Sequence, residues 1–464
     1  MARTGQGAPA VGAYRLLWRW HFYAGLFCLP FVLWLACTGL VYLFRPQLEP
    51  LLEQRYAHVT EAAPQPASAQ VKAALAAVPG TVLNAYELPS SAHAATRVLL
   101  GRGGELIRVY VDPASLRVLH VVRENDRFMR VVFYLHGELR AGTAGSMLVE
   151  LAASWTILLL LTGLYLWWPR GRRLSGVLYP RLRQGSRTAL RDLHAVTGVW
   201  VSLLALFLLV SGLPWAKSWG GLLREARQAM AAPVVQDWII GSADERARIA
   251  AQNTPPAPHA GHEGMAMAGD GSPAGTDLTV LDRVLPAVIA QHLAPPVLVA
   301  PPSRRTPHWS ARSTAADSTR QAELTLDPHS GAVVSRLDFA QKPMLDRWVG
   351  YGVAIHQGAL FPPLNQILSA FAALGLITMC LSSATLWWRG RPQGNGSIGA
   401  PPYTSARYPR AMVATLAVLG VLLPLLGVSM LAVLAVERWL LRRLPRARRL
   451  LGLPERTDTA PGHA

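Results

Sequence analysis

The sequence predicts a membrane all-α bundle of four to five transmembrane helices in two homologous halves, together with two small periplasmic α+β modules. Three observations predict this fold class: long apolar segments, basic residues gathered in the short loops, and a repeat that relates the two halves. The 464-residue chain is 51% apolar and only 16% charged, whereas about a quarter of the residues of a typical soluble protein are charged. Its formal charge is nevertheless +18, so the positions of the arginines are informative.

Four segments are long enough to cross a bilayer, which takes roughly 20 mostly apolar residues. The first apolar run is longer than the core of a signal peptide and no A-x-A site follows it, so we expect it to remain as a membrane anchor. The predicted order is tail and first span 1–44, first outer module 45–145, second span 146–168, basic loop 169–193, third span 194–216, outer region 217–363, fourth span 364–388, loop 389–410, fifth apolar segment 411–436 and basic tail 437–464.

The charge distribution predicts the orientation, because Lys and Arg concentrate in short cytoplasmic loops. Loop 169–193 holds seven Arg against one Asp, and loop 389–410 holds four Arg and no acid. The long segments 45–145 and 217–363 are nearly balanced, with 11 basic to 9 acidic and 13 to 13 residues. We therefore expect a multi-pass protein of a bacterial inner membrane, with its N-terminus in the cytoplasm and both long segments in the periplasm. The basic surplus reflects topology and contact with membrane lipid, and it does not indicate nucleic-acid binding.

The fifth apolar segment, 411–436, leaves two topologies open. A fifth span would place the C-terminal tail outside, yet residues 438–449 hold six Arg that favour the cytoplasm. A re-entrant or sharply kinked segment around Gly420–Pro424 would reconcile the two observations, because proline interrupts a helix.

Four histidines recur at equivalent positions in the two halves. The matching pairs are His21 with His194 and Gly25 with Gly198 at an offset of 173, and His136 with His356 and Trp167-Trp168 with Trp387-Trp388 at an offset of 220. Each half thus contains a His before each of its spans and a Trp-Trp pair after the second. Aromatic residues are typical of the membrane interface, and we expect the Trp pairs to serve there.

The predicted depths of these histidines point to a cofactor. His21 and His194 begin outward-going spans near the cytoplasmic face, and His136 and His356 precede inward-going spans at the outer face. A single His at an interface is usually only hydrogen-bonded, but four in register are typical of ligands. Imidazole from facing helices binds haem iron in bundle cores. We therefore predict two b-type haems, one near each face. No C-x-x-C-H motif is present for covalent attachment.

The outer segments carry a repeat of their own. Each begins with a helical pattern, at 69–78 and 278–293, and continues with strand-like runs and an Asp-Pro turn. The expected strands are 82–88, 96–100 and 106–111 in the first segment, and 297–300, 309–312 and 322–326 in the second. This pattern predicts two modules of about 60 residues, which is near the lower limit of independent folding.

The motifs together resemble those of a known family. They are Trp20-His21 with Gly25, Leu135-His136-Gly137, Leu193-His194 with Gly198, Ile355-His356-Gln357-Gly358, the two Trp-Trp ends, and the turns at Val111-Asp112-Pro113 and Leu326-Asp327-Pro328. Over roughly residues 14–390 the chain resembles the PepSY-associated transmembrane proteins, which include iron-regulated inner-membrane proteins and ferric-siderophore reductases. The resemblance implies that the outer modules are PepSY-like domains and that the four histidines are candidate haem ligands.

A linker rich in Ala, Gly and Pro, residues 250–277, is a departure from that pattern. It contains His259, His262, Met265 and Met267. Imidazole and thioether ligands suit copper, with Met favouring Cu(I). A flexible low-complexity linker explains the same residues without a metal, because short His-rich tracts are only compositional signals.

The leading functional hypothesis is electron transfer through haem across the membrane to reduce a periplasmic metal complex, first of all a ferric siderophore. No predicted cytoplasmic segment is large enough to form a dinucleotide-binding domain around a G-x-G-x-x-G loop, so we expect quinol or a separate reductase as the electron donor. Two alternatives remain open: a non-redox binding or regulatory protein of the PepSY type, and a periplasmic copper-handling protein that uses the 259–267 tract.

Overall fold

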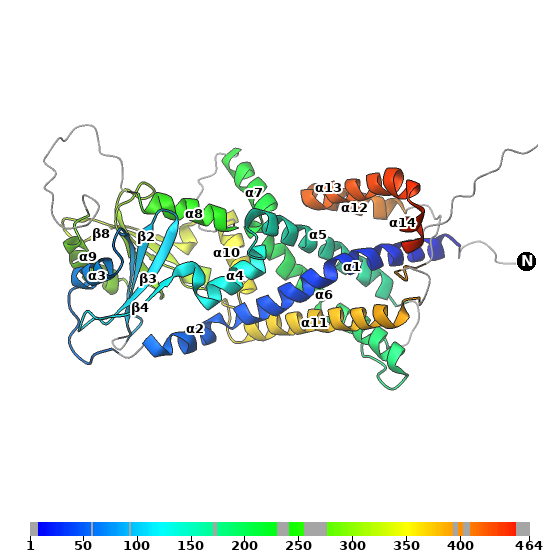
Figure 1. Ribbon diagram of the computed structural model, residues 1–464, viewed down its shortest axis with the longest axis horizontal. Helices are drawn as coiled ribbons and strands as arrows, with labels where there is room; N and C mark the ends of the chain where they lie inside the picture. The colour runs from blue at the N-terminus through cyan, green and yellow to red at the C-terminus, as the bar shows by residue number, and fades with distance from the viewer. Residues whose placement is uncertain are drawn as a thin grey trace, which may run out of the picture. The chain divides into compact units, whose positions relative to one another are not determined.

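The chain folds into two compact units (Figure 1). The computed structural model describes residues 8–56, 59–91, 94–169, 174–229, 241–254, 276–392, 398–401 and 409–451. We call one unit the helical unit; it comprises Met1–Leu40, Ala144–Leu222 and Leu368–Ala464. The other is the sheet unit, which comprises Val41–Thr143 and Leu223–Ile367. Several long helices run from one unit into the other.

Four helices of the described chain are long and apolar enough to cross a membrane. They are α1 (Ala8–Leu43), α5 (Gly142–Trp167), α6 (Ser186–Gly212) and α11 (Leu364–Gly390). Helices α1 and α6 begin earlier than the predicted spans, so His21 and His194 lie well inside them. Hydropathy marks only the apolar part of a helix, whereas flanking Arg, Leu and Tyr residues are also compatible with helical backbone.

The fifth apolar segment forms a helical hairpin. Helix α12 (Arg410–Leu422) is followed by the single residue Leu423, and α13 (Pro424–Ala435) begins at once with proline at its first position. The two helices lie side by side (Figure 1), and a Cβ on Gly427 would come within 2.5 Å of the Gly420 carbonyl oxygen. Each helix has at most 13 residues, or about 20 Å of length, which is shorter than the roughly 30 Å of a bilayer core.

The tip of this hairpin packs against α5 and the end of α6. Leu423 and Leu426 are buried together with Ile157 and Leu213. Indole groups fix the contact: Trp155 Nε1 donates to Ser429 Oγ over 3.0 Å, and Trp219 Nε1 donates to the Leu422 carbonyl over 3.1 Å. The second bond satisfies a carbonyl that the end of α12 would otherwise leave unpaired.

The C-terminal segment contacts the first helix. After α13 the chain continues through a π-helical turn (Val436–Leu440), a 3-10 turn (Leu441–Arg443) and α14 (Pro445–Leu450). The buried Arg19 donates to the carbonyls of Pro401 (2.6 Å) and Leu451 (2.7 Å), and the Tyr23 hydroxyl also donates to Leu451 O. The cation therefore holds the end of α14 against α1, two residues from His21.

The strands of both predicted modules join into one antiparallel sheet. Its order is β4-β3-β2-β1-β5-β6-β7-β8. The strands are β1 (Val82–Glu87), β2 (Thr96–Arg102), β3 (Glu105–Val111), β4 (Val118–Arg123), β5 (Val297–Ala300), β6 (Trp309–Ser313), β7 (Ala322–Leu326) and β8 (Val333–Asp338). The halves meet where β1 pairs with β5, with Tyr86 opposite Val299 and Glu87 opposite Leu298. A separate antiparallel sheet is thus present, but as one continuous structure instead of two separate modules.

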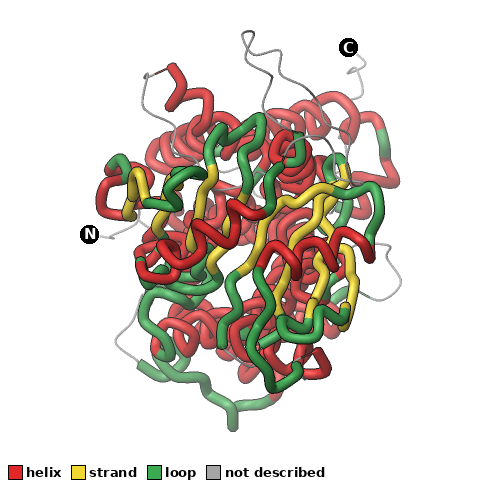
Figure 2. Tube along the Cα trace, turned by 90° about the vertical axis from the view of Figure 1, so that its left-hand side faces the viewer, coloured by secondary structure: helices red, strands yellow, loops and turns green. Residues whose placement is uncertain are grey.

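One face of the sheet is covered by the two predicted helices, α3 (Ala67–Ala77) and α9 (Thr279–Ala290). Figure 2 shows two helices lying across this face. Alternate strand residues such as Val98, Val109 and Leu324 are fully buried here with Val71 and Leu281 of the helices. This two-residue period is the one that an amphipathic strand requires.

The opposite face carries polar residues and is covered near the first half by helices that the sequence did not predict. They are α2 (Arg45–Glu53), α4 (Phe128–Glu138) and α8 (Gly241–Gln252). Gly101 of β2 has no side chain, and a Cβ there would overlap Asn253, just after α8, at 2.0 Å. Asn253 instead bonds the Gly103 carbonyl and Asn84, so α8 sits close against the strands.

Buried carboxylates hold the ends of the remaining helices. Glu150 of α5 accepts the backbone N–H groups of Ser218 and Trp219 at the start of α7 (Lys217–Ala229). Glu138 accepts the Ser242 N–H at the start of α8. Both carboxyl groups accept from N–H groups in the first turn of a helix, which have no acceptor within their own helix. Arg227 of α7 forms a 2.6 Å ion pair with Asp346 of α10 (Met344–His356), and both side chains are almost fully buried.

Candidate functional site

Two of the four predicted histidines face each other in the helical unit. His21 of α1 and His194 of α6 have ring centroids 6.4 Å apart, with ring planes at 80°. Their helices are far apart in sequence, so only the packing of the bundle brings the rings together. Imidazoles bound on the two sides of one metal ion have centres roughly 6 Å apart, because each metal–nitrogen bond is about 2 Å. The separation of the two rings is therefore right for one metal ion bound between them.

Each of these rings is held through its Nδ1 atom. His21 Nδ1 lies 3.0 Å from Thr162 Oγ1 of α5, and His194 Nδ1 lies 3.2 Å from the Met379 carbonyl of α11. Metal-binding His commonly uses one ring nitrogen for such a contact, which fixes its orientation, and the other for the metal. The Nε2 atoms are thus the ones that could bind a cofactor.

The residues that hold the rings repeat between the halves. The Thr162 hydroxyl donates to the carbonyls of Leu158 and Leu159. The Ser382 hydroxyl donates to those of Thr378 and Met379, and each of these residues lies 220 positions after its counterpart in the first half.

The Trp pairs also make equivalent contacts in the two halves. The indole of Trp167 donates to Val177 O (3.0 Å) and that of Trp387 to Ile398 O (2.9 Å), while the side chains of Trp168 and Trp388 are 67% and 60% exposed.

Glycines lie next to the ring of His21 and next to Met379, the residue that contacts the ring of His194. Gly25 and Gly198 each follow a histidine by four residues and so share its helix face. A Cβ on Gly163 of α5 would lie 3.2 Å from His21 Cε1, and one on Gly198 would lie 3.1 Å from the Met379 methyl group. A larger residue at Gly163 would crowd the His21 ring, and one at Gly198 would crowd Met379. Gly163 leaves the surface of α5 beside the His21 imidazole open, which suits a planar cofactor.

The other two histidines belong to the sheet unit. His136 lies in the last turn of α4, and His356 is the last residue of α10; both are half-buried. Residues with positive φ follow each helix, Leu139 (51°) and Arg140 (53°) after the first and Gly358 (72°) after the second. The chain then enters α5 and α11. Each histidine therefore sits just before a long apolar helix, as the repeat predicts.

The predicted copper ligands lie outside the described residues. His259, His262, Met265 and Met267 all fall in the stretch 255–275. Among the residues that the structure describes, no group of three or more His, Cys, Asp and Glu side chains is arranged to hold a metal ion. The copper hypothesis thus stays a prediction from the sequence.

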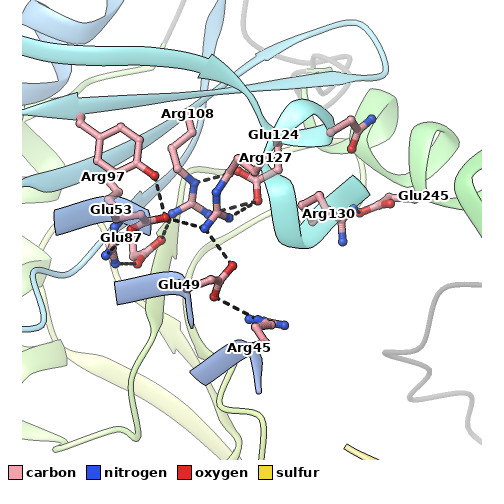
Figure 3. A network of polar contacts seen from close by, with 12 residues as sticks. Arg45, Glu49, Glu53, Glu87, Arg97, Arg108, Glu124, Arg127, Arg130 and Glu245 are labelled. Atoms are coloured by element: carbon pink, nitrogen blue, oxygen red, sulfur yellow. Dashed lines mark hydrogen bonds and ion pairs between the residues drawn. The ribbon is translucent and has the colours of Figure 1, made fainter. Parts of the chain in front are cut away.

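The polar face of the sheet carries a network of ion pairs (Figure 3). Arg108 of β3 binds Glu87 and Glu124 over 2.7 Å each, and Arg127 binds Glu124 over 2.7 Å. Arg127 also binds Glu53 (2.6 Å) and Glu49 (3.0 Å) of α2, and Arg97 joins Glu87 to Glu53. These side chains are at most 26% exposed. The network fastens α2 and the start of α4 to the strands, which the sequence did not reveal.

We expect the sheet unit to lose stability in acid because of this network. Burial alone would raise the pKa of Glu124, but Arg108 and Arg127 lower it to about 2. A carboxylate with a depressed pKa stabilises the fold above its unfolded value of about 4.5 and loses that contribution as the pH falls towards 2, here about 3 kcal/mol. Thermal unfolding in detergent, monitored by circular dichroism at pH values from 6 to 3, measures this loss of stability. Glu124→Gln should reduce the pH slope by one proton, and an unchanged slope would contradict the assignment.

A family model described as the PepSY-associated TM region matches residues 18–390, which is well over half of the chain. The matched residues include all four recurring histidines and the four long helices almost completely. No curated protein sequence matches the chain.

Proposed function

We propose that this chain, which belongs to the PepSY-associated transmembrane family, carries electrons across a bacterial inner membrane. It is a multi-pass membrane protein, because four of its helices are able to span a bilayer. In this proposal b-type haem is the carrier, and the acceptor is a metal complex in the periplasm, first of all a ferric siderophore. Haem supplies reversible one-electron chemistry when it is bound.

The facing pair of His21 and His194 is the observation that carries the proposal. Their 6.4 Å ring separation, their Nδ1 contacts with Thr162 and Met379 and Gly163 beside the His21 ring support a role for both histidines in holding haem. His21 and His194 would hold one haem, and the Thr162 hydroxyl would fix the ring of His21. The helices would exclude water from the iron.

The second haem is proposed for His136 and His356. Its support is the repeat: both histidines lie at the end of a short helix, directly before α5 and α11. With the basic loops in the cytoplasm, this pair would lie near the outer face and the first pair near the inner face. Electrons would then enter from quinol or a separate reductase and leave towards the periplasm.

An absorption spectrum of the detergent-purified protein tests the proposal directly. Expression under haem-replete conditions should give the bands of reduced low-spin b-type haem after dithionite is added, with a pyridine haemochrome assay showing two haems per chain. A protein without haem under these conditions would refute the proposal and favour a non-redox binding or regulatory role.

The orientation predicts where reporter fusions will be active. Fusions of alkaline phosphatase at Ala92 and Gly264 should be active because this enzyme matures only in the periplasm, while fusions at Gly185 and Gly394 should be inactive. The α12–α13 hairpin returns the chain to its starting side, so a fusion after Ala464 should also be inactive. An active fusion after Ala464 together with an inactive one at Gly394 would show that the hairpin opens into a fifth span.

A further inference from the structure

A cleft of about 830 Å³ opens on the polar side of the sheet unit. Its walls come from α2 with the 3-10 turn Gln54–Tyr56, from β3 and β4, and from the first turn of α4. Sites for small molecules usually have volumes of about 300–1,000 Å³ and mix apolar walls with a few polar groups. The cleft therefore has the size and character of a site for a compact ligand.

The charges in the cleft leave one cation free to bind. Glu49 and Glu53 face the cleft but are already paired with Arg127. Arg55 is exposed and makes no ion pair with any residue that the structure describes; its guanidinium lies 4.8 Å from the centre of the Tyr56 ring. Asp126 is an exposed carboxylate on the lining. An anionic ligand would thus find Arg55 as its partner and Asp126 as an opposing charge.

Aromatic rings form one wall. Tyr56 and His120 stack with centroids 4.2 Å apart and planes at 9°, and Tyr110 lies 5.0 Å from Tyr56. Burial and the nearby Arg55 lower the pKa of His120, so its ring is neutral at pH 7. Across the lining, Leu51 is 67% and Phe128 is 53% exposed. Flat aromatic groups of a ligand would cover these apolar surfaces and stack on the rings.

The cleft and His136 share one helix. Phe128, at the start of α4, lines the cleft, and His136 lies in the last turn of the same helix. Eight residues of α-helix correspond to about 12 Å. A ligand in the cleft is therefore close to the outer haem site proposed above, within the same folded unit.

We propose that this cleft docks the metal complex and selects a chelate that is anionic and aromatic, such as a ferric tris-catecholate. The inference rests on the proposed reductase function and names its substrate class. Tyr56 and His120 stack on the catechol rings, and Arg55 binds the anionic oxygens. One quinol, the donor proposed above, would supply two electrons and release two protons, and each electron would reduce one chelated Fe(III) to Fe(II).

Isothermal titration of the oxidised full-length protein in detergent tests the cleft without any reduction step. The probes are the ferric complex of 2,3-dihydroxybenzoate, which is anionic and aromatic, and the ferric complex of acetohydroxamate, which is neutral and has no ring. The first should bind and the second should bind at least tenfold more weakly. Arg55→Gln should weaken binding of the first about tenfold, the effect of losing a hydrogen bond to a charged group. Tyr56→Leu should weaken it about three- to tenfold.

Two further substitutions are matched controls. Arg117→Gln removes an exposed cation in the turn between β3 and β4, away from the lining, and should leave binding unchanged. Asp126→Asn should keep or strengthen binding, because it removes a repelling charge. Circular dichroism checks that each variant is folded. Equal binding of both probes, or unchanged binding by Arg55→Gln and Tyr56→Leu, would overturn the docking proposal.

The outcome separates this inference from the proposed function. Catecholate binding that depends on Arg55 in a protein that holds no haem would retain the cleft and refute the reductase. Haem reduction of either probe without any effect of Arg55 or Tyr56 would retain the reductase and refute the cleft.

Discussion

Replacement of His194 with alanine is expected to remove one of the two haems and to stop electron transfer to an external acceptor. The ring of His194 faces that of His21 at 6.4 Å, and no other described histidine belongs to the helical unit. The haem-to-protein ratio should fall from two to about one, because the other pair lies in a different folded unit. His21→Ala should have the same effect, and the double variant should lose no more haem than either single one.

Two variants control this experiment. His308→Ala alters a histidine outside the repeat and should keep both haems. Thr162→Val keeps both ligands but removes the hydroxyl near His21 Nδ1; it should keep the low-spin spectrum while weakening haem retention about 10- to 100-fold, the usual effect of losing a group that orients a ligand. If His194→Ala kept two haems with an unaltered spectrum, the pairing of His21 with His194 would be wrong.

Replacement of Arg108 with methionine is expected to destabilise the sheet unit by about 3–5 kcal/mol. Methionine fills a similar volume but leaves Glu87 and Glu124, which are 5% and 12% exposed, without their shared cation. Glu87 keeps Arg97 and Glu124 keeps Arg127, but each buried carboxylate loses one of its two cations, which is costly because water does not solvate it in exchange. Urea unfolding in detergent, monitored by proteolysis of the unfolded sheet unit, measures the change in the free energy of unfolding.

Arg336 offers a matched control on the last strand. It pairs with Asp338 over 3.0 Å, but both side chains are more than 40% exposed, so Arg336→Met should cost less than about 1 kcal/mol. A similar loss for both variants would mean that the network contributes no more than a surface pair. An Arg108→Met variant as stable as the original protein would mean that water solvates the carboxylates of the network.

The sequence predicted the long helices and the strands well, for a physical reason. A membrane span needs an unbroken apolar run, and a half-buried strand needs alternation, so both leave local patterns. The helices α2, α4 and α8 were not predicted, because part of their packing uses ion pairs instead of an apolar stripe: Glu53 of α2 pairs with Arg97 of β2, and Arg130 of α4 pairs with Glu245 of α8. The union of β1 with β5 was also hidden: it joins residues about 210 positions apart, and no local pattern encodes such a pairing.

The candidate site was predictable only in part. His21 and His194 stood out through the repeat, and the structure brings their rings together. The Met379 carbonyl that holds His194 has no signature, since every residue has a carbonyl. Thr162 and Ser382 recur at an offset of 220. A hydroxyl inside a span usually bonds a carbonyl of its own helix, as both of these hydroxyls do, so the additional contact of Thr162 with His21 could not be predicted.

The seam between β1 and β5 has a consequence for how the chain originated. Each half ends its share of the sheet at this seam, and the pairing there is antiparallel, which is the relation that a two-fold axis imposes on identical strands. A half-length ancestor would have exposed β1 as an open edge, which invites association with another chain. Two such ancestors pairing β1 with β1 would have built the same eight-stranded sheet as a homodimer. Fusion of two such copies would then have made the pairing permanent and left each half free to diverge.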